Sequence, residues 1–290
     1  MITIFTCPKA FEGNTAVIQR NAILSWVSMG NNCEIILIGD DDGVADFAGK
    51  HNLQHVPEVD KSKAGVPLIN SIFEKGEKAA SFPIVAYVNA DIILGNDFVK
   101  AVEICSSQKK FLMVGQRIDL DVNELVNFDN GEWYRLLTSR ATAEGRKKGI
   151  AAIDYFVFRK GLFQSIPPFT IGRFSWDNWL LYKAKAAAAK LIDATAFVIA
   201  IHQNHSSIYE DTDNGKKEKE IEENKKYADD KIYDLLDCTY RVDEKGIIPF
   251  RDSEHVWRRA WRLREKRPAV WKMLVSWKVR YAMCWLFPLL

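Results

Sequence analysis

The sequence has few cysteines, no long apolar run and little net charge, and each of these absences excludes a class of protein. Its 290 residues include five cysteines, an odd number without any C-x-x-C pair. A disulfide framework or a structural zinc site is therefore not expected, and a reducing cytoplasm fits best. No apolar run approaches the ~18 residues of a spanning helix. The net charge of +2 gives no reason to expect a nucleic-acid partner.

The N-terminus and the distribution of charge also bear on location. Residues 2–6 (Ile-Thr-Ile-Phe-Thr) follow a strand pattern, without the cationic lead and apolar core of a signal peptide, so none is expected. From Arg251 onward there are 10 Lys and Arg but only 3 Asp and Glu, which leaves a net −5 on residues 1–250. The sequence therefore predicts a basic tail on a mildly acidic body.

Strand and helix patterns alternate along the first 200 residues. Residues 2–6 and 34–38 are strand-like and enclose a helical pattern that begins at Asn14 or Thr15, which makes a βαβ unit and hence a parallel sheet. Further strands are expected at 84–88, 111–115, 153–158 and 194–201. Further helices are expected after Leu68, Asn96 and Ser175. The predicted fold class is α/β, a mostly parallel sheet flanked by helices.

The stretch 84–94 carries the strongest functional signal. Ile84 to Val88 is an apolar run typical of a strand buried on both faces, and it ends at Asn89-Ala90-Asp91. Polar groups at alternate positions of a strand end project the same way, toward the edge where open α/β sheets bind ligands. Oxygen ligands of this kind suit a hard divalent cation that holds a diphosphate. The alternative is a strand end capped by local side-chain hydrogen bonds.

Other polar residues are expected at the same edge. Thr6, Lys9 and Asp40 follow the first two strands, and Arg117 follows the strand at 111–115. A guanidinium matches phosphate oxygens geometrically, so Arg117 is a candidate diphosphate contact, although a surface ion pair is equally plausible. Asp40 begins an acidic run that could hold a nucleobase or ribose or could be a solvated turn. Residues 122–150 are charged and irregular enough to form a lid.

Two later segments supply candidate acid–base and metal groups. Ser175 is a good N-cap, which places Asp177 in the first turn of a helix, where the helix dipole favours a charged carboxylate. An ionised carboxylate at a cleft suits a general base, and a helix-start Asp is the structural alternative. His202 and His205, three apart beyond the strand predicted at 194–201, are either metal or phosphate ligands or surface histidines.

These segments together resemble a family. The blocks are Thr6-Cys7-Pro8-Lys9, the helix with Gln19, Asn21 and Trp26, Gly39-Asp40, Val88 to Asp91, Asp154 to Phe158, Trp176 to Trp179, and Asp193 to Thr195 leading to His202 and His205. In this order they look like bacterial GT-A-fold glycosyltransferase-like proteins, over residues 1–208.

The resemblance implies a nucleotide-sugar donor, a divalent cation (Mn²⁺ or Mg²⁺) and transfer to a hydroxyl of a glycan or lipid-linked acceptor. In that reading Thr6, Lys9, Asp40 and Asn89 contact the donor, Asp91 is the metal or diphosphate residue, and His202 is a second metal ligand. Arg117 or Arg173 neutralises the leaving diphosphate. Asp154 positions the acceptor and Asp177 is the base of an inverting transfer. Asn89 replaces the first carboxylate of the family's Asp-X-Asp element, which leaves the metal requirement open.

Two other functions remain open at this point. A sugar-nucleotide nucleotidyltransferase uses a similar sheet but needs a Gly-rich, basic loop after the first strand, and residues 6–10 offer none. A non-catalytic, membrane-bound binding module fits Asn89 and the basic tail, whereas Asp91 and Asp177 argue against it.

The tail completes the predicted organisation. Residues 1–208 are expected to form the catalytic domain, 209–250 a charged helix with a small hairpin, and 251–290 a basic, Trp-rich amphipathic helix. Five of the nine tryptophans lie in this last part. A basic face beside a Trp-rich face is typical of a helix lying on a membrane surface, so we expect a cytoplasmic protein at the inner face of the membrane. The alternative is a helix packed on the protein.

Overall fold

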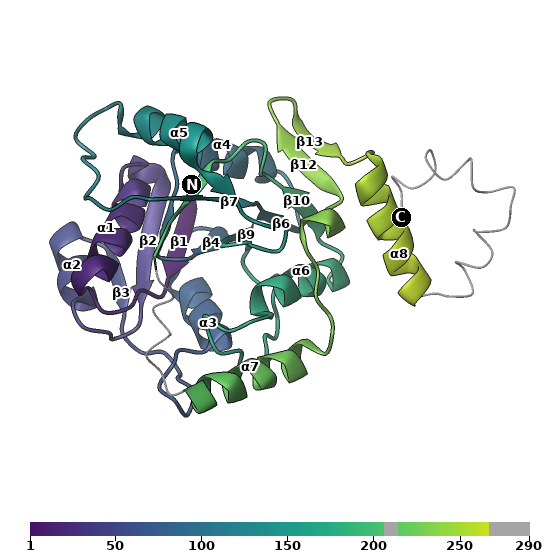
Figure 1. The fold of residues 1–290 in the computed structure, drawn as a ribbon, viewed down its shortest axis with the longest axis horizontal. Helices are drawn as coiled ribbons and strands as arrows, with labels where there is room; N and C mark the ends of the chain where they lie inside the picture. The colour runs from purple at the N-terminus through teal and green to yellow at the C-terminus, as the bar shows by residue number, and fades with distance from the viewer. Residues whose placement is uncertain (206–213, 267–290) are drawn as a thin grey trace, which may run out of the picture.

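The computed structural model describes residues 1–205 and 214–266, and in this part of the chain helices and strands alternate as expected (Figure 1). The strands are β1 (Ile2–Thr6), β2 (Cys33–Ile38), β3 (Gln54–Val56), β4 (Ile84–Val88), β5 (Ile92–Ile93), β6 (Phe111–Val114), β7 (Arg117–Leu120), β8 (Arg146–Lys147), β9 (Tyr155–Arg159), β10 (Lys190–Asp193), β11 (Ala200–Gln203), β12 (Tyr240–Asp243) and β13 (Gly246–Pro249). The α-helices are α1 (Gly13–Val27), α2 (Val44–His51), α3 (Ile69–Ala79), α4 (Asn96–Cys105), α5 (Trp133–Glu144), α6 (Trp176–Ala186), α7 (Asn214–Ala228) and α8 (Ser253–Lys266), and η1 (Gly30–Asn32) and η2 (Leu235–Asp237) are short 3₁₀ turns.

The larger sheet has nine strands in the order β13-β12-β10-β6-β9-β4-β1-β2-β3. Its neighbouring strands are parallel except that β9 is antiparallel to β4 and β6, and β13 is antiparallel to β12. The prediction of a mostly parallel sheet flanked by helices is confirmed.

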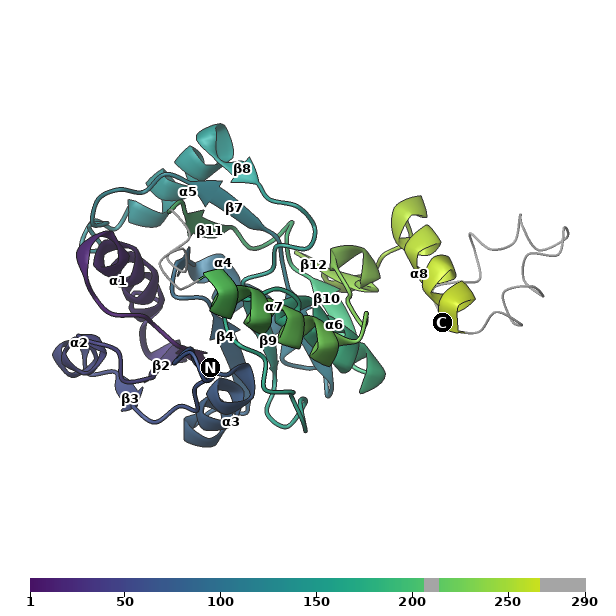
Figure 2. The same cartoon turned by 60° about the horizontal axis from the view of Figure 1, so that its bottom comes forward.

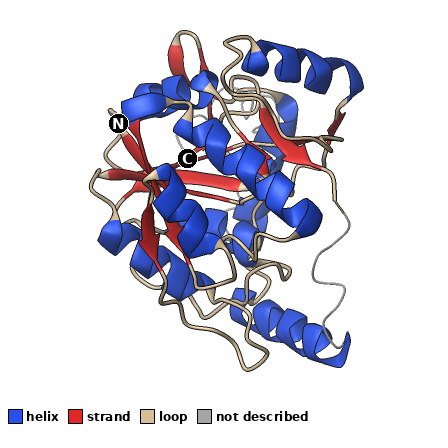
Figure 3. Cartoon of the chain, turned by 90° about the vertical axis from the view of Figure 1, so that its left-hand side faces the viewer, coloured by secondary structure: helices blue, strands red, loops and turns tan. Residues whose placement is uncertain are grey.

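Helices cover both faces of this sheet, so its strands bury side chains on both sides (Figure 3). Phe5 belongs to the apolar cluster that includes residues of α3 and α6, whereas its neighbour Ile4 belongs to the cluster that includes residues of α1, α2 and α4. Both side chains are 0% exposed. Burial on both faces explains the near-continuous apolar runs of β1 and β4.

A second sheet of four short strands, in the order β5-β11-β7-β8, stands beside the first. Figure 2 shows β7, β8 and β11 together near α5, away from β4 and β9. Strand β5 comes three residues after β4, and β11 pairs with both β5 and β7. Segments from residues 91, 117 and 202 therefore meet at the junction of the two sheets.

The prediction of a strand over 194–201 is wrong. The chain forms β10 before this stretch and β11 at its end, with turns between them. Asp193 explains the break: its side-chain Oδ1 accepts a hydrogen bond of 2.8 Å from the backbone N–H of Thr195. This local bond turns the chain, and the apolar residues that follow fill the core without pairing as a strand.

The C-terminal part is attached to the larger sheet. Strands β12 and β13 form the predicted hairpin, and β12 pairs with β10, so segments on both sides of the predicted boundary at residue 208 belong to one hydrogen-bonded sheet. Helix α8 is the described part of the predicted amphipathic tail, whereas residues 267–290 lie outside the described residues. Among the described helices, none combines the length and apolarity required to cross a bilayer.

Candidate active site

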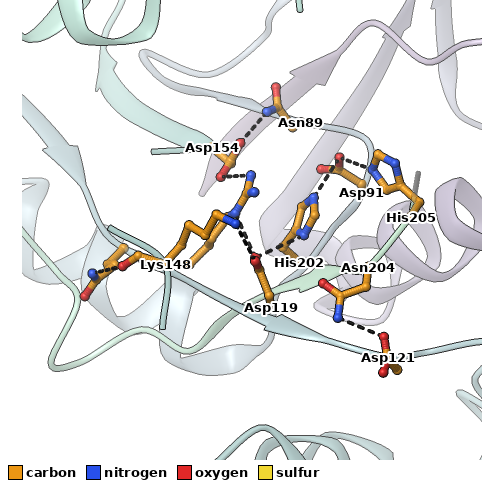
Figure 4. Close-up of polar contacts among 11 residues, drawn as sticks. Asn89, Asp91, Asp119, Asp121, Lys148, Asp154, His202, Asn204 and His205 are labelled. Carbon is orange, nitrogen blue, oxygen red and sulfur yellow. Dashed lines mark hydrogen bonds and ion pairs between the residues drawn. The ribbon is translucent and has the colours of Figure 1, made fainter. Parts of the chain in front are cut away.

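Two polar residues meet where β4 ends and β9 begins. The strands are antiparallel with Val88 opposite Tyr155, so Asn89 and Asp154 are neighbours at one sheet edge. The Asn89 side-chain amide donates a 2.7 Å hydrogen bond to Asp154 Oδ1, and Arg117 Nη1 lies 3.0 Å from Asp154 Oδ2 (Figure 4). Burial raises the pKa of Asp154, while the charge of Arg117 opposes that rise.

This contact gives Asn89 a role other than metal binding. Its amide nitrogen is directed at Asp154 Oδ1. An amide can donate to a neighbouring carboxylate, whereas an Asp at this position would place two negative charges side by side. The departure from an Asp-X-Asp pattern therefore fits the local chemistry.

Asp91, His202 and His205 form the candidate metal centre. Asp91 Oδ2 lies 3.2 Å from His205 Nε2 and 3.5 Å from His202 Nε2, and the three ligand atoms lie within 4.8 Å of one another. Burial alone would raise the pKa of Asp91, but hydrogen bonds and charge from the two histidines outweigh it and hold the pKa below its ordinary value. The other oxygen, Asp91 Oδ1, is buried without a hydrogen-bond partner. A buried, unpartnered carboxylate oxygen beside two imidazoles is a fitting site for a divalent cation.

The cluster lies on the wall of a cavity of about 590 Å³, large enough for a small ligand. Eight of the ten predicted site residues line this cavity. They are Lys9, Asn89, Asp91, Arg117, Asp154, Arg173, Asp177 and His202. The fold therefore brings together most of the residues that the sequence singled out.

Thr6 and Asp40 are the predicted site residues that do not line this cavity. Thr6 is fully buried inside β1, and the Asp40 side chain is 61% exposed and lies 2.6 Å from Lys61 Nζ. Strands β1 and β2 end at the expected edge of the sheet, but the side chains of Thr6 and Asp40 do not line the cavity. Thr6 is instead packed inside the protein, and Asp40 pairs with Lys61 at the surface.

Asp177 lies in the first turn of α6, as predicted, but its electrostatics differ from the prediction. Burial raises its pKa to about 7, and the nearby Asp154 adds to the rise, whereas hydrogen bonding to the backbone N–H of Asn178 lowers it. The expectation that the helix start keeps this group strongly ionised is therefore wrong, because desolvation outweighs the helix terminus. Ser175 makes no side-chain cap and has φ +91°, an unusual backbone conformation for a residue with a side chain.

A lysine and a cysteine also line the cavity. The backbone of Lys9 is fixed by Gln19, whose side chain accepts from its N–H (2.7 Å) and donates to its carbonyl (2.9 Å). Burial lowers the pKa of Lys9 to about 8, so its ammonium form titrates close to neutral pH. Burial raises the pKa of the Cys7 thiol to about 12, which argues against a nucleophilic role for this residue.

Arg173 is held at the cavity by α7. Its Nη2 and Nε lie 2.8 and 2.9 Å from Glu220 Oε2, and the two side chains are only 1% and 7% exposed. Asn224, also on α7, donates to the carbonyls of Thr170 (3.0 Å) and Phe174 (3.3 Å). Helix α7 therefore holds the turn before α6 through these side-chain contacts.

Two contributors to the site, Gln19 and Glu220, were not predicted. His205 was considered together with His202, three residues earlier, as either a metal or phosphate ligand or a surface histidine, and the structure places it beside Asp91. Gln19 was noted only as part of a helix block, and nothing local marks Glu220 within its run of charged residues. Its role depends on a contact 47 positions away in the chain.

Comparison with known proteins supports the fold. No protein-family model and no curated protein matches the sequence. Among solved structures, GalNAc-T7 with UDP, GalNAc and Mn²⁺ is similar at a TM-score of 0.50, with 12% identity over 79% of this chain and 48% of that one. The chain has a GT-A-like fold.

Two further solved structures are similar at lower scores. TarS of S. aureus has 12% identity over 79% of this chain and 43% of that chain, with a TM-score of 0.47. Glucosyl-3-phosphoglycerate synthase from Mycobacterium tuberculosis, with Mn²⁺, UDP and phosphoglyceric acid, has 15% identity over 71% and 72%, with a TM-score of 0.44. This GT-A-like chain spans less than half the length of the matched TarS and GalNAc-T7 chains.

Proposed function

We propose that this chain is a metal-dependent glycosyltransferase that moves a sugar from a nucleoside diphosphate donor to a hydroxyl of a glycan or lipid-linked acceptor. The observation that carries the proposal is the meeting of Asp91, His202 and His205 on the wall of the cavity that Asp177 also lines. GalNAc-T7, with a similar fold, was solved with UDP and Mn²⁺. UDP and Mn²⁺ are therefore the first ligands to test.

The donor set of the metal centre favours Mn²⁺ over Mg²⁺. Mg²⁺ prefers oxygen ligands almost exclusively, whereas two of the three groups here are imidazoles. When bound, the cation would offset the negative charge that a departing nucleoside diphosphate acquires. Lys9 and Arg173 line the same cavity and would add positive charge near that diphosphate.

Asp177 is the proposed general base of an inverting transfer. It lines the cavity, and its pKa of about 7 matches the requirement that a base be poised near the working pH. Its carboxylate would accept the proton of the acceptor hydroxyl while that oxygen attacks the anomeric carbon from the face opposite the diphosphate. Asp154, held by Asn89 and Arg117, would stay fixed and order the acceptor side of the cavity.

Ligand binding tests the donor and metal parts of the proposal. Calorimetry with Mn²⁺ alone, and with UDP, GDP, CDP and dTDP in its presence, should show Mn²⁺ binding and at least one nucleotide that binds more tightly with the metal. Asp91→Ala should abolish the metal enhancement. Asp121→Ala is the matched control, because this carboxylate is exposed and outside the cluster. Equal nucleotide and Mn²⁺ binding by the Asp91→Ala protein would refute the assignment.

Turnover and stereochemistry test the base. Asp177→Asn should fold and bind donor normally but transfer sugar about 10²–10⁴-fold more slowly, the usual range for a lost proton transfer. NMR of the product should show inversion at the anomeric carbon. Retention, or near-normal transfer by a folded Asp177→Asn protein, would remove Asp177 from this role.

We also propose that α8 lies against the inner face of the membrane, which would bring a lipid-linked acceptor near the site. Its exposed residues fall on one helical stripe, Ser253, Glu254, Trp257, Trp261 and Arg264, and the two tryptophans are 66% and 45% exposed. The helix is held on the protein through Arg258 and Arg262, which pair with Asp234 and Asp237.

Vesicle binding tests this location. The full chain should co-sediment with anionic vesicles at low salt and less so with neutral ones, because interfacial tryptophans insert and basic residues attract anionic lipid. Replacing Trp257 and Trp261 together by Ser should reduce binding without unfolding the protein. Full-length protein that stays in the supernatant with anionic vesicles would contradict the proposal.

A further inference from the structure

Asp119 lies directly beside His202 because of the register of the smaller sheet. Strands β7 and β11 are parallel with Asp119 paired to His202, so the two side chains leave the same face of adjacent strands. Asp119 Oδ1 lies 3.2 Å from His202 Nδ1, and the side chains are 12% and 10% exposed. Asp119 does not line the cavity, so any influence it has on a ligand passes through the histidine.

The two ring nitrogens of His202 face different groups. Nε2 is directed at Asp91 and the candidate metal centre, whereas Nδ1 faces Asp119 (Figure 4). A neutral imidazole can bind a cation only through the nitrogen that carries no proton. A carboxylate beside the other nitrogen favours the proton there, and this fixes the tautomer and the orientation of the ring.

Two cations compensate the charge of Asp119 and hold it in place. Arg117 Nε lies 2.9 Å from Asp119 Oδ1, and Lys148 Nζ lies 3.5 Å from Oδ2. Arg117 comes from two positions earlier on the same strand and also pairs with Asp154. Because the Lys148 side chain is 53% exposed, Arg117 is the stronger anchor.

We propose that Asp119 is a positioning residue of the metal centre. It keeps the proton of His202 on Nδ1, so that Nε2 is free to coordinate a divalent cation together with Asp91 and His205. The effect of Asp119 on metal binding rests on the proposed function. The tautomer of His202 is a property of the metal-free protein and can be measured separately.

An isosteric variant separates this role from a purely structural one. In Asp119→Asn, Arg117 still donates to the side-chain oxygen, and this is the oxygen that faces His202 Nδ1, so the new NH₂ group takes the other position, on the side of Lys148. An amide oxygen beside Nδ1 still favours the proton there, whereas Asp119→Ala leaves no acceptor from this residue. Asp119→Asn should therefore keep the Nδ1–H form and impair the metal centre less than Asp119→Ala.

The experiment uses the full-length protein and two measurements. Long-range ¹H–¹⁵N spectra of the metal-free protein, with the His202 signals assigned through a His202→Gln variant, report the tautomer. Titration with Mn²⁺ alone reports affinity. Wild type and Asp121→Ala should show the Nδ1–H form and equal affinity. Asp119→Ala should shift toward the Nε2–H form and bind Mn²⁺ roughly 10–100-fold more weakly, the usual effect of losing such a partner, and Asp119→Asn should lie closer to wild type in both measurements.

Two outcomes would overturn the inference. One is an unchanged His202 tautomer in Asp119→Ala, and the other is Mn²⁺ affinity within twofold of wild type in Asp119→Ala. Failure of the proposed function looks different, because wild-type protein would then bind no Mn²⁺ at all. In that case the tautomer in wild type and Asp119→Ala still decides whether Asp119 positions His202.

Discussion

Asn21 of α1 and Gln203 of β11 lie 182 positions apart in the chain and share a buried hydrogen bond of 3.0 Å. Gln203 also donates to the carbonyls of Ile18 (2.8 Å) and Asp91 (3.2 Å). The pair therefore ties the first helix to the strand that carries His202 and to the backbone of the proposed metal ligand.

Asn21→Ala is expected to destabilise the protein by about 1–3 kcal/mol, because it leaves buried polar groups without partners. The side-chain amide that is lost donates to the Glu124 carbonyl and to Gln203, and its oxygen accepts from the N–H of Val126. Urea denaturation measures the change. Asn204→Ala, at an exposed position whose side chain donates to Asp121 at the surface, should stay within about 0.5 kcal/mol of wild type.

Breaking the buried pair of Arg173 and Glu220 should cost more. Glu220→Ala leaves a guanidinium that is 1% exposed without its carboxylate, and breaking such a pair costs about 3–5 kcal/mol. Chemical denaturation checks the magnitude, with Glu218→Ala, exposed on the same helix, as the control. A loss below 1 kcal/mol would show that α7 does not hold the turn before α6 through this pair.

Two helical glycines should respond in opposite directions to alanine. A Cβ on Gly76 would lie 2.4 Å from the ring of Phe5, so Gly76→Ala should destabilise the protein by about 1–3 kcal/mol through overpacking, despite the better helix propensity of Ala. Gly49 in α2 has nothing within 4 Å of that position. Gly49→Ala should raise stability by up to about 1 kcal/mol. Thermal and urea unfolding of both variants measure the difference.

The raised pKa of Asp177 predicts a dependence of stability on pH. Its pKa is about 7 in the folded protein and near the ordinary 3.8 when unfolded, so between these values the folded state binds the extra proton. Stability from this group is therefore present at low pH and is lost as pH rises toward 7. Asn resembles the protonated acid, so Asp177→Asn should be more stable than wild type at pH 8 and similar to it at pH 4. Urea titrations at both values test this, and an equal difference at the two pH values would contradict the shifted pKa.

The sequence predicted the parts of the site that depend on local pattern. Apolar runs identified β1 and β4, and the abrupt change at Asn89 identified the ligand edge. Parallel-sheet geometry then placed Lys9 and Asp91 at the same edge, because strand ends converge. Asp91 and His202 meet for another reason, because β11 pairs with β5.

The remaining parts depend on strand register and long-range packing, which local pattern does not encode. Asp119 and His202 are partners only because β7 and β11 pair in one particular register. The apolar run at 194–201 was misread as a strand because Asp193 turns the chain by accepting hydrogen bonds from the backbone and the hydroxyl of Thr195. The pKa of Asp177 was misjudged since its burial comes from the tertiary structure.

The clamp that α7 places on the turn before α6 has a consequence for synthesis of the protein. Arg173 leaves the ribosome 47 residues before Glu220, and Asn224 follows later still. Until those residues emerge, α7 offers no partner to the guanidinium of Arg173. The turn before α6 therefore stays hydrated, and this wall of the cavity is not yet formed. The cavity is therefore completed only after Glu220 and Asn224 have been made, although all of the residues that line it, the last being His205, precede them in the chain.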